Sequence, residues 1–253
     1  MKKSILLTLL LALSFTVSAT ETKLMVRAKA KDAKFIGSSI GGAYVIVRNS
    51  TNNKILAEGI TTGSTGNTDL IMKTPIGRNT QLTDDKTAGF LAVVDIDEPT
   101  FVRVEVLSPY NKKNAQVHAS TELWLIPGKD ILGDGVVVEI PGFIIDILTP
   151  NTHQYISKQS IGNGLDIRAN MVMMCGCPIE KGGTWDSTPM EVVAILKKDG
   201  TTLATIPLNN PSRNVFEGRM EIAEAGYYEV TVYAYDPTTG NTGVDKVNYV
   251  VTD

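Results

Sequence analysis

The chain has 253 residues, of which 43% are hydrophobic and 20% charged, and its formal net charge at pH 7 is −3. This balance, without a long cluster of lysine or arginine, argues against a nucleic-acid partner. The two cysteines, Cys175 and Cys177, are separated by a single residue, so they cannot staple distant parts of a fold.

The first predicted element is a short apolar segment at the N-terminus. Lys2 and Lys3 precede a mainly apolar stretch over 5–17, and small residues up to Ala19 are followed by the polar Thr20. This order is typical of a cleaved secretory signal peptide. The stretch is shorter than the roughly 20 apolar residues of a transmembrane helix. We therefore expect a periplasmic or extracellular mature chain without a membrane span.

The mature chain is predicted to be all β-sheet, because runs rich in valine, isoleucine and tyrosine alternate with glycine, asparagine and proline and no stretch keeps a helical period. The strands expected in the first half cover 23–30, 42–49, 54–58, 69–73, 89–95, 100–107, 119–126 and 136–140. Those expected in the second half cover 153–156, 165–174, 190–197, 202–206, 215–222, 227–235 and 246–251. Strands of this length and spacing suit two tandem β-sandwich domains.

The domain boundary is placed at Pro150. The apolar segment 143–148 is expected to close the first unit, and the proline that follows disfavours continuation of a strand. This division predicts a signal peptide over 1–19, one sandwich over 20–150 and a second over 151–253.

In the first half, a strand over 41–47, a turn and strand over 52–59 and a glycine turn over 63–66 follow one another. In this order the segment resembles the prealbumin-like carboxypeptidase regulatory domain. The resemblance covers about residues 36 to 75 and includes no catalytic residue. It implies a prealbumin-like sandwich with a scaffold or accessory role.

In the second half, residues 225–232 look like the penultimate strand of immunoglobulin-like sandwiches. In that strand a tyrosine after a tight turn buries its ring and bonds its hydroxyl group to the backbone. Tyr228 occupies this position, which places Val230, Val232 and Ala234 on the core face. The resemblance is to a bacterial immunoglobulin-like domain. The cysteine pair that joins the two sheets of antibody domains is missing, so the resemblance implies no immune recognition.

Residues 171–178 hold both cysteines and three of the eight methionines of the chain. Because side chains alternate along a strand, Met171, Met173, Cys175 and Cys177 are predicted to share one face. As core side chains the two methionines would be ordinary. The cysteines are different, because they fall where the strand gives way to a glycine-rich loop.

Sandwich topology predicts what surrounds this run. The loops 175–188 and 236–243 should lie at the same end of the second sandwich, and the linker with His153 is expected to join them there. The sulfur run would then face the first domain in an interdomain cleft, a favoured place for ligands.

Three chemistries compete for the two cysteines. Thiolates and thioethers select soft ions, above all Cu(I), with Cys175 and Cys177 as ligands and Met173 plus Met171 or His153 as auxiliaries. Alternatively, the cysteines form a disulfide closed through Gly176, as a redox handle or a lock on the loop. In the third interpretation both thiols merely pack at the junction.

No set of catalytic groups is evident, since the chain has only two histidines and neither has an apparent nucleophile beside it. We therefore expect an exported, non-catalytic binding protein that captures a soft metal, with copper as its one cofactor. The alternatives are a structural or adhesive surface module that binds a protein or glycan partner at the cell envelope, and a thiol redox protein. Asp186, Asp236 and Asp245 form a further candidate site, for calcium.

Overall fold

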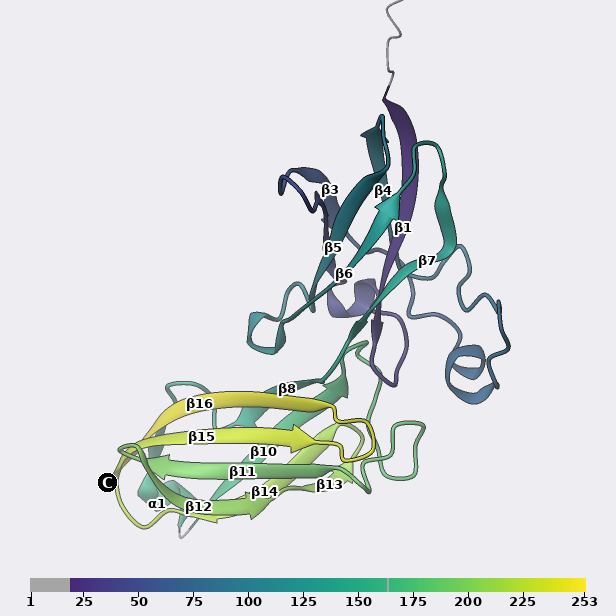
Figure 1. Ribbon diagram of the computed structural model, residues 1–253. Helices are drawn as coiled ribbons and strands as arrows, with labels where there is room; N and C mark the ends of the chain where they lie inside the picture. The colour runs from purple at the N-terminus through teal and green to yellow at the C-terminus, as the bar shows by residue number, and fades with distance from the viewer. Residues whose placement is uncertain (1–18, 163) are drawn as a thin grey trace, which may run out of the picture.

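The computed structural model describes residues 19–162 and 164–253, so the predicted signal peptide lies outside the described residues except for Ala19. The described chain consists mainly of β-strands in four sheets (Figure 1), which confirms the predicted all-β class. Within these two ranges, no helix has the length and hydropathy needed to cross a membrane.

Seven strands form the first pair of sheets. They are β1 (Thr20–Ala30), β2 (Tyr44–Asn49), β3 (Ile55–Ile60), β4 (Phe90–Ile96), β5 (Thr100–Ser108), β6 (Val117–Leu125) and β7 (Ile131–Ile140). One sheet has the order β4-β1-β7, with β1 parallel to β7, and the other has the antiparallel order β3-β2-β5-β6. Alternate residues such as Val102, Val104 and Val106 are fully buried, as expected where two sheets pack face to face.

Nine strands form the second pair of sheets. They are β8 (Phe143–Thr149), β9 (Tyr155–Ser157), β10 (Gly164–Met173), β11 (Glu191–Lys198), β12 (Thr201–Pro207), β13 (Asn209–Ser212), β14 (Val215–Glu221), β15 (Gly226–Tyr235) and β16 (Thr242–Thr252). The sheet orders are β13-β14-β10-β8 and β12-β11-β15-β16-β9. The chain therefore begins in one sheet with β8, which pairs with β10, and crosses to the other with β9, which lies parallel to β16. This arrangement is consistent with an immunoglobulin-like sandwich.

Four short helical turns interrupt the strands: η1 (Ser38–Ile40), η2 (Asp69–Lys73), η3 (Lys113–Ala115) and α1 (Lys158–Ile161). The prediction of a strand over 69–73 was wrong, because η2 is a single helical turn. The Asn67 side chain accepts the backbone N–H groups of Asp69 and Leu70 at 2.9 and 3.1 Å, and these local bonds favour a turn over a sheet ladder.

The apolar segment 143–148, expected to close the first unit, is instead the first strand of the second pair of sheets. β8 pairs with β10 along its length, so the chain passes from one pair of sheets to the other at Pro141 and Gly142, before Pro150. An apolar run predicts a buried strand but not the sheet that the strand joins. Here the pairing with β10 places the strand in the second pair of sheets. Hereafter "first unit" means β1–β7 and "second unit" means β8–β16.

Candidate functional site

The sulfur-rich run lies where β10 ends, against the first unit. Met171 and Met173 are 0% and 1% exposed and belong to the core. A tight loop follows, in which the Gly176 N–H donates to the Met173 carbonyl oxygen at 2.7 Å and the Met173 N–H donates to the Cys177 carbonyl oxygen at 3.1 Å. Gly176 has a φ of +73°, which favours glycine. A disulfide between Cys175 and Cys177 closes the loop.

This disulfide bears directly on the expected soft-metal site. Sulfurs joined to one another are not thiolates, so Cys175 and Cys177 do not offer the ligands that Cu(I) prefers in this state. Both residues are also buried, at 1% and 5% exposed. Within residues 19–162 and 164–253, no group of three or more histidine, cysteine, aspartate or glutamate side chains is arranged to hold a metal ion.

His153 is not at the junction, contrary to the sequence-based expectation. The His153 N–H donates to the Asn248 carbonyl oxygen at 2.6 Å, beside the part of β16 that pairs with β9. The junction end of β16 is the opposite one, where the backbone of Gly243 lies against Phe143. His153 lies away from the junction because β8 carries the chain from the junction to the far end of the second unit before His153 is reached.

The two loops of the second unit that were predicted to meet the first unit do so. The Trp185 indole N–H donates to the Asp32 carbonyl oxygen at 2.9 Å, and the Asn241 side-chain amide donates to the Lys31 carbonyl oxygen at 3.2 Å. The oxygen of the same amide accepts the Gly142 N–H at 2.7 Å. Asn241 is fully buried. Its side chain thus connects the second unit to the Lys31 backbone of the first unit and to Gly142, where the chain passes between the units.

A cleft of about 430 Å³ opens between the units beside the disulfide. Its walls are formed by residues of the first unit and of the loop 175–178, together with Trp185 and Arg213. Lys34 donates to the Thr68 hydroxyl group at 3.0 Å, and burial lowers the pKa of its ammonium group. Arg213 lies 4.0 Å from a carboxylate oxygen of Glu180. The cleft is therefore polar, and the disulfide forms part of its wall.

The three carboxylates proposed as a calcium site take part in separate hydrogen-bond networks. Asp186 accepts the N–H groups of Gly182 and Thr188, and these bonds lower the pKa of its carboxyl group. Asp236 accepts the N–H of Thr238 and the hydroxyl of Thr239 within its own turn. Asp245 accepts the Ile147 N–H of β8 at 2.8 Å. Each carboxylate holds a loop or strand in place, so the calcium prediction is not supported.

A second pocket, which the sequence did not reveal, lies at the far end of the second unit. Its volume is about 480 Å³, and its lining includes His153, Tyr227 and polar side chains of β11, β15 and β16. The alternation of side chains along β15 was sufficient to predict that Tyr227 lies on the outer face of the sheet. The missing information was the pairing of β9 with β16, which brings His153 and Tyr155 to the same place.

The predicted burial and backbone hydrogen bond of the tyrosine at the start of the penultimate strand are confirmed. Tyr228 is buried, and its hydroxyl group donates to the Glu224 carbonyl oxygen at 2.7 Å, four residues upstream. Its ring stacks on that of Tyr249 with a centroid separation of 5.5 Å. The Tyr249 hydroxyl is buried without a protein hydrogen-bond partner in the described part of the chain, and burial raises the pKa of this phenol.

The two stacked tyrosines are expected to respond differently to replacement by phenylalanine. Tyr228→Phe removes a satisfied hydrogen bond and should lower the free energy of unfolding by about 1 kcal/mol. Tyr249→Phe removes a buried unpaired hydroxyl and should leave that energy unchanged or raise it by less than about 1 kcal/mol. Urea unfolding of both variants measures the difference, and equal losses would contradict the assignment.

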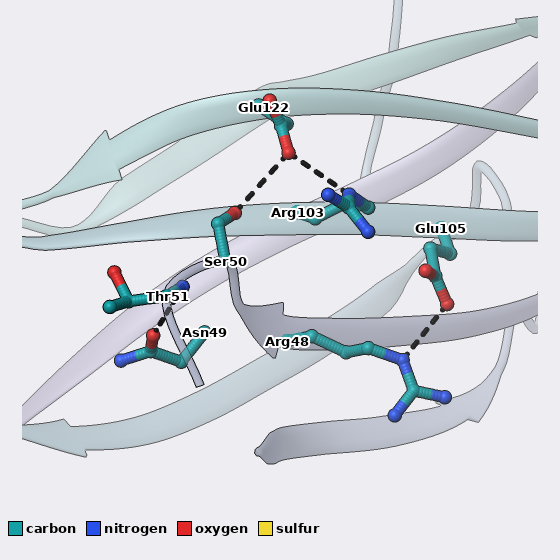
Figure 2. Close-up of polar contacts among 7 residues, drawn as sticks. All are labelled: Arg48, Asn49, Ser50, Thr51, Arg103, Glu105 and Glu122. Carbon is teal, nitrogen blue, oxygen red and sulfur yellow. Dashed lines mark hydrogen bonds and ion pairs between the residues drawn. The ribbon is translucent and has the colours of Figure 1, made fainter. Parts of the chain in front are cut away.

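The outer face of β2, β5 and β6 is charged (Figure 2). Arg48 pairs with Glu105 at 3.0 Å, and Arg103 pairs with Glu122 at 2.9 Å, from neighbouring strands. Ser50 also donates to Glu122 at 3.3 Å. Ion pairs that satisfy one another across a sheet are typical of a solvated face. This face is therefore a poor candidate for an apolar docking surface.

The strand order and the junction define an all-β protein of two sandwich-like units, and comparisons with known proteins add little to this. No family model matches the chain, and no curated protein matches it. Fibronectin(III)-like modules of Clostridium thermocellum CbhA are 13% identical, cover 92% of this chain and 94% of their own, and have a TM-score of 0.27. An engineered protein is 14% identical over 51% of this chain and 24% of its own, with a TM-score of 0.34. Escherichia coli alpha-2-macroglobulin is 9% identical over 92% of this chain and 22% of its own, with a TM-score of 0.22.

Proposed function

We propose that the protein is an exported, non-catalytic binding module, built from a prealbumin-like and an immunoglobulin-like sandwich. In this proposal the sulfur run is structural, and partners bind at other surfaces. The Cys175–Cys177 disulfide is the observation that carries it, because joined sulfurs leave neither thiolate ligands nor free thiols.

The surroundings of the disulfide support a role as a lock. The Gly176 backbone lies so near Ile40 of η1 that a Cβ atom built there would be 3.5 Å from that side chain. Cross-linking across one residue restricts the loop to conformations that fit this surface. Export also agrees with a disulfide, because such bonds persist in the oxidising periplasm or outside the cell. The partner in this proposal is a protein or glycan at the cell envelope.

Soft-metal capture remains a second candidate, restricted to the reduced protein. Its support is that β10 ends at Met173, two residues before Cys175, so reduction of the disulfide would leave two thiols close in sequence to a thioether. His153 has no part in this version, because it lies at the other end of the second unit.

Native mass spectrometry of mature protein isolated without reductant, together with elemental analysis, tests the proposed function. We expect a mass two hydrogen atoms below that of the dithiol form and no stoichiometric copper. Free thiols with one equivalent of copper would overturn the structural role and favour metal capture.

The control is a Cys175→Ser, Cys177→Ser double variant titrated with Cu(I) beside the reduced wild-type protein. Equal, weak binding by the two proteins supports the structural role. Stoichiometric copper binding that only the wild-type protein shows would contradict it.

A further inference from the structure

We propose that the pocket at the far end of the second unit binds a neutral carbohydrate chain. This site is separate from the cysteine loop, and the inference stands independently of the role assigned to the disulfide.

The first observation is a row of aromatic side chains on the outer face of the sheet. Tyr227 of β15 pairs with Val250 of β16, and Val250 pairs with Tyr155 of β9, so the three side chains lie in one row. Tyr227 and Tyr155 are 71% and 64% exposed, the highest values among the large hydrophobic side chains described. Two strand spacings separate them, roughly 9.5 Å.

A third ring adjoins this row. The His153 imidazole packs edge-on against the Tyr155 ring, with centroids 5.2 Å apart. His153 also has a φ of +58°, a conformation that residues other than glycine seldom adopt. Its N–H bond to the Asn248 carbonyl oxygen holds it there, beside the pocket. Three exposed rings thus gather at one end of this sheet, in a chain in which only 6% of residues are phenylalanine, tryptophan or tyrosine.

The polar groups of the pocket fit hydroxyl groups. Glu229 lies 3.8 Å from Lys197 and 3.2 Å from Lys246, so its carboxylate is shared between two ammonium groups. Asn248 and Asp199 complete the polar lining. The lining therefore holds both donors and acceptors, and its two ammonium groups are balanced by two carboxylates, so the pocket favours neither an anion nor a cation.

Exposed rings beside such groups suit a sugar chain. The C–H faces of a pyranose ring are apolar and stack on an aromatic ring, while its hydroxyl groups both donate and accept hydrogen bonds at the rim. The open outer face of the sheet leaves room for a chain that extends from one tyrosine to the other. A protein partner is the competing occupant, and the experiment separates the two.

Native affinity electrophoresis tests the proposal, with separate gels that contain hydroxyethylcellulose, xylan, galactomannan or glycogen. We expect at least one polysaccharide to retard the wild-type protein, and Tyr227→Ala and Tyr155→Ala each to weaken its apparent affinity at least fivefold. Isothermal titration with a hexasaccharide of the positive polymer should reproduce this order.

Tyr235→Ala is the matched control, because Tyr235 lies on the same face of β15 at its other end and is 41% exposed. It should leave retardation unchanged, as should Cys175→Ser with Cys177→Ser. Thermal unfolding followed by circular dichroism should show that all variants fold. Absence of retardation in all four gels, or retardation that persists in a Tyr155→Ala, Tyr227→Ala double variant, would overturn the proposal.

Discussion

Trp185→Ala is expected to lower the free energy of unfolding by about 4 kcal/mol, because the substitution empties a large volume in a packed environment. Trp185 is only 6% exposed and joins the core cluster. The substitution also removes the indole bond to the Asp32 carbonyl oxygen, a direct link between the two units. Urea unfolding followed by far-ultraviolet circular dichroism measures the loss, since the fluorescence of the wild-type protein includes this residue.

Trp124 provides the matched control, because the chain has only two tryptophans and this one is 59% exposed on β6. Trp124→Ala should cost less than about 1 kcal/mol. Trp185→Phe keeps most of the ring and loses the N–H donor, so its cost should lie between the two. Equal losses for Trp185→Ala and Trp124→Ala would show that the junction contributes no packing energy.

Arg27→Met should lower the free energy of unfolding by about 3 kcal/mol, since it removes the donor to the buried carbonyl groups of Thr87 and Ala88. Arg27 is 5% exposed, and its guanidinium group donates to the carbonyl oxygens of Thr87, Ala88 and Gly133. One side chain thus fixes the segment before β4 and the bulge of β7 against β1. Burial lowers the pKa of Arg27, and Asp134 and Asp84 oppose that shift.

Arg103→Met is the control for this prediction. Arg103 also lies on a strand of the first unit, but it is partly exposed and its pair with Glu122 reaches solvent, so a loss below about 1 kcal/mol is expected. Arg27→Lys retains the charge but not the planar fork of donors, and should recover only part of the stability. If Arg27→Met matched Arg103→Met, the buried bonds would not hold the segment in place.

Arg27 also illustrates what the sequence does not disclose. Alternation in β1 buries Leu24, Val26 and Ala28 and places Arg27 on the outer face, where a charged residue is unremarkable. The segment that covers Arg27 comes from about 60 residues further along the chain, and no periodic pattern in β1 reports that contact. Burial by a distant loop is a tertiary property.

Elsewhere, local sequence patterns were sufficient to predict which side chains are buried. The β10 face of Leu165, Ile167 and Ala169 and the burial of Tyr228 follow from alternation and turn chemistry, which depend on neighbours in sequence. Which sheet the segment 143–148 joins depends instead on partners far along the chain. That one assignment placed His153 at the wrong end of the second unit, and with it one member of the predicted metal site.

The parallel pairing of β1 with β7 also has a mechanical consequence. In the first unit β1 lies parallel to β7, and in the second unit β9 lies parallel to β16, the final strand. The C-terminus lies at the end of the second unit away from the first (Figure 1). Tension between the start of β1 and the end of β7 would load the ladder between these two strands in shear. The hydrogen bonds of this ladder would have to rupture together rather than unzip one at a time.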